Sequence, residues 1–151
     1  MKKEFIMRGK TASGSTEVLN FSGYKEGYAY RLIEFKLYPS TNIGGETTEL
    51  VGSVTAGKTA VAPTDPDFNN EGLIGVASAT HYSSPAYPPS SRSVINDLFL
   101  ITQNLILMVQ DTDASGSQYP VNWQCRFVME KMNGPEEAAN NYKQYLISDG
   151  S

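Results

Sequence analysis

The chain has 151 residues, a length at which one domain can bury a core without a disulfide or a metal ion to stabilise it. Sixteen acidic and 12 basic side chains give a net charge of −4, which argues against electrostatic binding of nucleic acid. Thirteen glycines, eight prolines and nine tyrosines favour strands joined by loops. We therefore expect a single domain over residues 1–151 and no nucleic-acid partner.

Export and membrane insertion are not expected. The first ten residues contain a shorter apolar run than a signal peptide needs, and the longest apolar run, residues 105–109, is too short to span a bilayer. Cys125 is the only cysteine, so the chain cannot form an internal disulfide. We expect synthesis in a reducing cytoplasm and no membrane partner.

Eight segments have the composition of β-strands, with β-branched and aromatic residues bounded by Gly, Pro, Asn, Asp and Ser. The expected strands are residues 3–8, 17–21, 28–38, 48–54, 73–79, 98–102, 104–110 and 121–129. The segment between the fifth and sixth of them, residues 83–93, is expected to be a surface loop.

Two of these segments predict which side chains face the core. In the last one, Trp123, Cys125 and Phe127 alternate with polar residues, which places them on one face. In the third, the same argument places Ile33 and Phe35 together on the inner face. Each of these strands is therefore expected to have one buried face and one solvent-exposed face.

One helix is expected, over about residues 135–145. Pro135 suits the first helical position, and Glu136 and Glu137 suit the positive end of a helix dipole. Many short strands followed by one short C-terminal helix predict an all-β fold, an antiparallel β-sandwich, with a jelly roll as one arrangement of it. The strand order cannot be derived from these patterns.

Residues 52–59, GSVTAGKT, match the GxxxxGK[ST] pattern of phosphate-binding loops. Such a loop needs a helix that begins near its lysine, here Lys58, so that the helix N-terminus faces the phosphates. Pro63 and the Asp, Asn and Gly residues after it do not favour a helix there. We therefore interpret the segment as a glycine-rich turn or the end of a strand.

Two acidic loops resemble calcium sites only in part. Residues 111–116, DTDASG, begin like a calcium-binding loop, but Asn122 stands where the bidentate glutamate is expected. A second oxygen-rich cluster consists of Asp65, Asp67, Asn69 and Glu71. We interpret both as solvated turns and expect no metal ion or other cofactor.

The sequence offers little support for catalysis. His81 is the only histidine, and no partner that would orient it as a base can be identified. Cys125 is expected to be buried and unreactive. Glycoside hydrolysis uses two carboxylates at a defined separation. Glu34 and Glu130 have the required side chains, but the sequence does not give the distance between them. We therefore expect a protein that is not an enzyme.

The proline-rich loop after residue 82 is the candidate partner-binding segment. Tyr82, Tyr87 and Arg92 lie in or beside it, and prolines reduce the entropy that the loop loses on binding. Tyrosines in such a loop suit either a carbohydrate platform or a protein contact. They also suit simple packing over the end of the sandwich.

Five segments are distributed between residues 17 and 147: EVLNFSGY, GYAYRLIEFKLYPS, VINDLFLITQNLILMV, VNWQCRFVMEKM and EEAANNYKQYLI. In this pattern the chain resembles small virion structural proteins of tailed bacteriophages of marine bacteria. The resemblance implies a non-enzymatic capsid decoration or cement protein, made in the cytoplasm of the bacterial host and located in the virion.

The same resemblance implies partners: the major capsid protein or other virion subunits, and further copies of the chain, with a trimer as one arrangement. It assigns no binding residue. Two alternatives remain open: a carbohydrate-binding module on a tail or capsid surface, and a calcium-stabilised domain.

Overall fold

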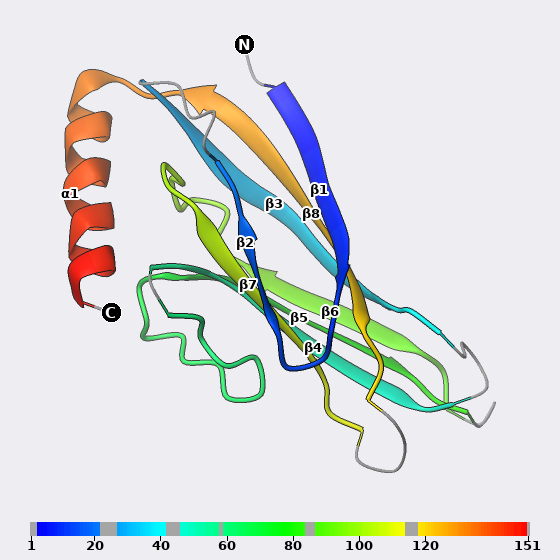
Figure 1. Cartoon of the computed structure of the whole chain (residues 1–151). Coiled ribbons are helices and arrows are strands. Elements are labelled where there is room, and N and C mark those ends of the chain that lie inside the picture. The colour runs from blue at the N-terminus through cyan, green and yellow to red at the C-terminus, as the bar shows by residue number, and fades with distance from the viewer. Residues whose placement is uncertain are drawn as a thin grey trace.

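A computed structural model describes residues 3–21, 27–41, 46–57, 59–83, 87–113 and 118–150 (Figure 1). These residues form eight strands and one helix. Their bounds are β1 Lys3–Thr11, β2 Thr16–Leu19, β3 Tyr28–Pro39, β4 Thr48–Ala56, β5 Leu73–His81, β6 Ser90–Ile95, β7 Leu105–Asp111, β8 Val121–Lys131 and α1 Gly134–Gly150.

The strands form two antiparallel sheets, one in the order β1-β8-β3 and the other in the order β2-β7-β4-β5-β6. The first strand pairs with the last, β1 with β8, the second with the seventh, β2 with β7, and the fourth with the fifth, β4 with β5. Such a series of pairs arises when one long hairpin is rolled up. This arrangement is the plan of a jelly roll, in which the fourth pair would be β3·β6. Here β6 pairs with β5 instead. The predicted antiparallel β-sandwich is confirmed.

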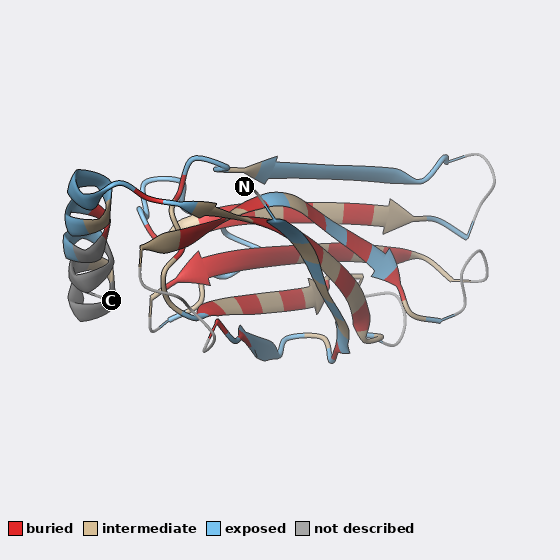
Figure 2. Ribbon diagram, turned by 90° about the horizontal axis from the view of Figure 1, so that it is seen from above, coloured by how far each residue is buried: buried red, intermediate tan, exposed pale blue. Residues whose placement is uncertain are grey.

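The core lies between the two sheets and is made of the side chains that alternate inward along the strands (Figure 2). Cys125 and Phe127 are fully buried and Trp123 is 8% exposed, as the alternation predicts. The ring of Phe127 stacks on Phe5 at 5.5 Å between centroids and meets Phe21 edge to face at 5.1 Å. The Trp123 indole N–H donates to Thr11 Oγ1 at 2.9 Å, so the one polar atom of that buried ring has a partner.

The predicted inner face of β3 is wrong at one position. Phe35 is 1% exposed, as expected, but Ile33 is 37% exposed and Leu32 takes the inner place. The pairing of β3 with β8 shifts by one residue between Leu32 and Glu34. A β-bulge of this kind reverses the alternation on one side of it, and the sequence carries no clear signal for it.

Two segments between residues 90 and 102 were predicted incorrectly. Residues 90–93, expected to be the end of a loop, belong to β6, and residues 98–102, expected to be a strand, make only an isolated bridge from Ile101 to Tyr30. Phe99 and Ile101 are buried, so this irregular segment contributes two apolar side chains to the end of the core. Strand β6 is exposed along nearly its whole length, which explains why it lacks an apolar pattern.

Helix α1 covers the expected residues and continues to Gly150. It begins in a capping box: Asn133 Oδ1 accepts the Glu136 N–H at 2.8 Å, and Glu136 Oε1 accepts the Asn133 N–H at 3.2 Å. Asn140 donates to Thr102 at 3.3 Å, which attaches the helix to the sandwich. Among the described residues, no helix has the length and apolar character needed to cross a membrane.

Candidate functional site

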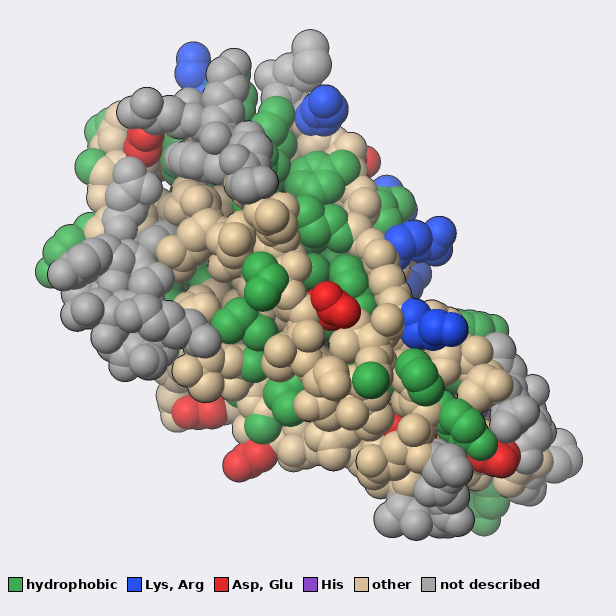
Figure 3. Space-filling model, viewed as in Figure 1, with side chains coloured by type: hydrophobic (Ala, Val, Ile, Leu, Met, Phe, Trp, Pro, Cys, Tyr) green, Lys and Arg blue, Asp and Glu red, His purple; other side chains and the backbone are tan. Residues whose placement is uncertain are grey.

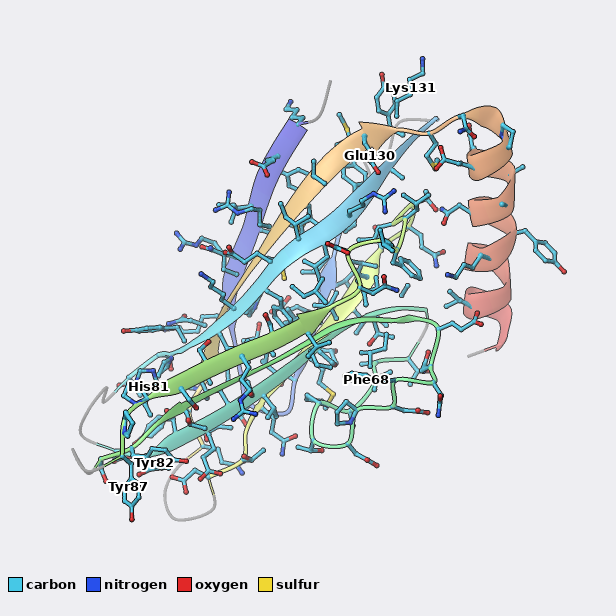
Figure 4. All side chains as sticks on the ribbon, turned by 180° about the vertical axis from the view of Figure 1, so that it is seen from behind. Phe68, His81, Tyr82, Tyr87, Glu130 and Lys131 are labelled. Carbon is cyan, nitrogen blue, oxygen red and sulfur yellow. The ribbon has the colours of Figure 1, made fainter. Side chains whose placement is uncertain are left out.

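Four aromatic side chains gather where β3 and β5 end, and we call Tyr38, His81, Tyr82 and Tyr87 the aromatic end (Figure 4). Tyr82 and Tyr87 approach within 5.6 Å between ring centroids at 54°, and Tyr38 meets His81 at 5.6 Å and 68°. Tyr87 is 63% exposed and Tyr38 54%. These large rings lie at the surface of the sandwich, where a partner can reach them.

Hydroxyl groups position the chain at this end. The Ser83 N–H donates to Thr47 Oγ1 at 3.2 Å, and the hydroxyls of Thr80 and Ser90 lie 2.6 Å apart. The first bond joins the residue after Tyr82 to the residue before β4, and the second joins β5 to the start of β6. The strand ends that flank the two tyrosines are therefore held to neighbouring chain.

The structure brings two of the three predicted contact residues together. Arg92 is exposed on β6, where it pairs with Ser78 of β5. Tyr82 is four residues farther along that chain, roughly 13 Å at the usual rise of a strand. Tyr82 and Tyr87 thus form one surface, and Arg92 lies apart from them. Residues 84–86 of the predicted loop lie outside the described residues.

The phosphate-loop pattern falls on a strand. Residues 52–56 are part of β4, and Gly52 pairs there with Ala77. Ser53 Oγ donates to the Val61 carbonyl at 2.5 Å, and Thr55 Oγ1 accepts the Val61 N–H at 3.2 Å. These hydroxyls fix the chain after β4, and residues 59–62 are not helical, as the strand-end interpretation predicts. Lys58 lies outside the described residues.

The aspartate that opens the calcium-like pattern has a structural role in the fold. Asp111 is fully buried at the end of β7, where its carboxylate accepts the N–H groups of Glu49 at 3.2 Å, Asp113 at 3.1 Å and Tyr119 at 3.4 Å. Backbone donors therefore occupy the oxygens that a cation would need. The described residues contain no cluster of three His, Cys, Asp or Glu side chains suited to a metal ion, and residues 114–117 lie outside them.

The other residues considered for catalysis, Glu34, Glu130 and Cys125, do not form a catalytic group. Glu34 pairs in register with Arg126, four residues from Glu130 on the same strand, which separates the two glutamates by roughly 13 Å. This is a spacing of backbone positions, and each carboxylate has a cation of its own, which for Glu34 is Arg126 at 4.0 Å. Glu130 forms an ion pair with Arg31. Burial raises the pKa of the Cys125 thiol far above its ordinary value, so the thiol stays protonated and unreactive.

One pocket of about 310 Å³ lies at the other end of β5, among the β4–β5 loop, β6 and α1. Its wall includes Phe68, Glu71, Val94, Asn96 and Lys143. Phe68 is 64% exposed and Val94 57%, so the pocket is a shallow surface hollow. It is at the lower end of the size range of small-molecule sites.

The strands of the β1-β8-β3 sheet carry a positive charge that the net charge of the whole chain conceals. Strands β1, β3 and β8 contain seven of the 12 basic residues and three of the 16 acidic ones, a net charge of +4, while the rest of the chain carries −8. Figure 3 shows basic side chains along the side where β1 runs. The alternation of charged residues in residues 3–11 could have indicated this face, but only the strand pairing brings the three strands together.

Comparisons with known proteins add little. No protein-family model matches the chain, and no curated protein matches its sequence. A structure of Desmodium yellow mottle tymovirus aligns over 87% of both chains with 9% identity and a TM-score of 0.40. One of Cocksfoot mottle virus aligns over 93% of this chain and 100% of that chain, also with 9% identity and a TM-score of 0.40. Similarity at this level carries no argument about function.

Proposed function

We propose that the chain is a non-enzymatic virion structural protein, a decoration or cement protein that binds the major capsid protein on the outside of a tailed-phage capsid. The observation that supports this most is the aromatic end, where Tyr82 and Tyr87 are exposed and their rings contact each other. Jelly rolls occur in viral capsid proteins and also in lectins, so the fold is compatible with the proposal without establishing it.

The chemistry of the aromatic end favours a protein partner. A tyrosine buries a large area for two rotatable bonds and keeps a hydroxyl for hydrogen bonding, so it contributes much binding free energy for little entropy loss. The neighbouring edge strand β6 adds the small polar residues Ser90 and Ser91 at this end of the sheet. A partner that covers this end would bury aromatic area at the centre and satisfy hydroxyls at the rim.

The described residues also favour a role without catalysis. The Cys125 thiol is buried and protonated, Glu34 and Glu130 are separated, and the His81 ring packs edge on against Tyr38. A nucleophile activated by a neighbouring base, the arrangement that hydrolases share, does not occur among these groups. The aromatic end is therefore best explained as a binding surface.

Replacing both tyrosines tests the proposal. Tyr82→Ser with Tyr87→Ser should weaken attachment to phage capsids stripped of this protein at least about tenfold, because hot-spot aromatics contribute 2 kcal/mol or more each. The melting temperature should change little, since Tyr87 is 63% exposed. Quantitative pelleting with capsids measures the attachment. Tyr142→Ser, at a 66% exposed tyrosine on α1, is the matched control and should bind as the wild type does.

A carbohydrate-binding module is the second candidate, favoured by the same exposed rings. The 54° tilt between Tyr82 and Tyr87 does not give one flat platform, but Tyr87 alone can stack on a sugar. If the double variant saturates capsids normally and loses binding on a glycan array, the carbohydrate function replaces the proposed one. If it unfolds, the tyrosines serve the core and the contact surface lies elsewhere.

A further inference from the structure

The exposed face of the β1-β8-β3 sheet carries cations, two of which have no ion-pair partner among the described residues. In register across the sheet, Arg8 lies beside Gln124 and Gln124 beside Lys36, while the next row is Lys10, Asn122 and Tyr38. We call Arg8, Lys10 and Lys36 the basic face. Among the described residues, Arg8 and Lys10 have no carboxylate within ion-pair distance, and Lys36 has only Glu34 at 3.9 Å.

An acidic surface lies elsewhere on the same chain. The loop between β4 and β5 contains Asp65, Asp67 and Glu71, all exposed, and residues 59–83 include no Lys or Arg. The loop is built of turns: Asp67 Oδ1 accepts the Asn69 N–H at 2.9 Å, and the Gly72 carbonyl accepts the Ala56 N–H at 2.7 Å. We call Asp65, Asp67 and Glu71 the acidic loop. Its hydrogen bonds hold it in a defined shape.

The two surfaces cannot meet within one molecule. Strand β1 runs along one side of the sandwich and the loop projects from the opposite side (Figure 1), where Figure 3 shows acidic side chains. Each surface also carries an exposed apolar side chain beside its charges: Ile6, 45% exposed, on β1, and Phe68, 64% exposed, next to Asp67. An apolar centre with complementary charges around it is the usual composition of a protein interface.

From this complementarity we propose that the basic face binds the acidic loop of a second copy of the chain. Because different surfaces meet, the contact is heterologous, and it closes into a ring when the rotation between copies permits. This inference goes beyond the proposed function, because it names a second copy of the chain as a partner in addition to the capsid protein. A phosphate backbone is the weaker candidate, because the exposed Ile6 beside these cations suits an apolar partner side chain such as Phe68 and has no counterpart on a phosphate backbone.

Charge reversal on each surface tests this contact. In sedimentation of the purified protein, the wild type should self-associate, and added salt should weaken the association. Arg8→Glu with Lys10→Glu, and separately Asp65→Lys with Asp67→Lys, should each raise the dissociation constant about tenfold or more. A mixture of the two variants should associate again, because each reversed surface meets its complement. Lys3→Glu with Lys131→Glu, with the same charge change at the far end of the sheet, should behave as the wild type does.

Several outcomes would overturn the inference. A wild type that stays monomeric, variants that associate as it does, or a mixture that fails to associate would each do so. Loss of binding to duplex DNA in Arg8→Glu with Lys10→Glu, without any self-association of the wild type, would replace the second copy with nucleic acid. Capsid attachment through Tyr82 and Tyr87 is measured separately, so the two proposals can fail independently.

Discussion

Phe127→Ala should lower the free energy of unfolding by about 3–5 kcal/mol, the usual cost of truncating a fully buried phenylalanine. Phe127 is 0% exposed on the central strand of its sheet, and its ring contacts Phe5 and Phe21. The smaller side chain loses this apolar burial and leaves a cavity among aromatic rings. Urea denaturation measures the change from the midpoint and slope of the transition.

The control for this variant is the same substitution at an exposed position. Phe68 is 64% exposed, so Phe68→Ala should change stability by less than about 1 kcal/mol. A loss at Phe127 no larger than the loss at Phe68 would show that the core between the two sheets is not packed as described.

Asp111→Ala should destabilise the protein by about 3 kcal/mol, because it leaves three partly buried backbone N–H groups without this acceptor. The donors belong to Glu49, Asp113 and Tyr119, so this one carboxylate connects the end of β7 to β4 and to the segment before β8. Thermal unfolding followed by circular dichroism measures the loss.

Asp111→Asn separates the hydrogen bonds from the volume of the side chain. The amide keeps one oxygen, which can still accept the Glu49 and Asp113 N–H groups, and places an N–H₂ group where the Tyr119 N–H donates. We expect a loss smaller than that of Asp111→Ala. Equal losses in the two variants would mean that the carboxylate does not accept these bonds.

Sequence patterns predicted the fold class, because both signals are local. Apolar residues at every second position indicate a strand with one buried face, and Gly, Pro, Asn and Asp indicate the turns between strands. Trp123, Cys125 and Phe127 were placed correctly, since an uninterrupted strand with one buried face has a period of two. Ile33 was placed on the wrong face, because a bulge shifts the register without changing composition. Strand β6 was missed because its side chains are exposed and its backbone pairing with β5 leaves no apolar pattern.

The candidate sites depended more on tertiary structure. Aromatic composition singled out Tyr82 and Tyr87, but their 5.6 Å approach and the distance of Arg92 from them come from the pairing of β5 with β6. Net charge concealed the basic face, because Arg8 and Lys36 are far apart in the sequence and lie two strands apart in one sheet. Such clusters form only when strands pair, so a linear count of charges does not find them.

The copy number of the chain in purified phage particles tests the proposed virion role most directly. Quantitative mass spectrometry of gradient-purified particles should find it at the copy number of the major capsid protein or a simple fraction of it. A few copies per particle would instead indicate a tail component. If the chain is not found in particles while it accumulates in the infected cell, the proposed role in the virion is contradicted.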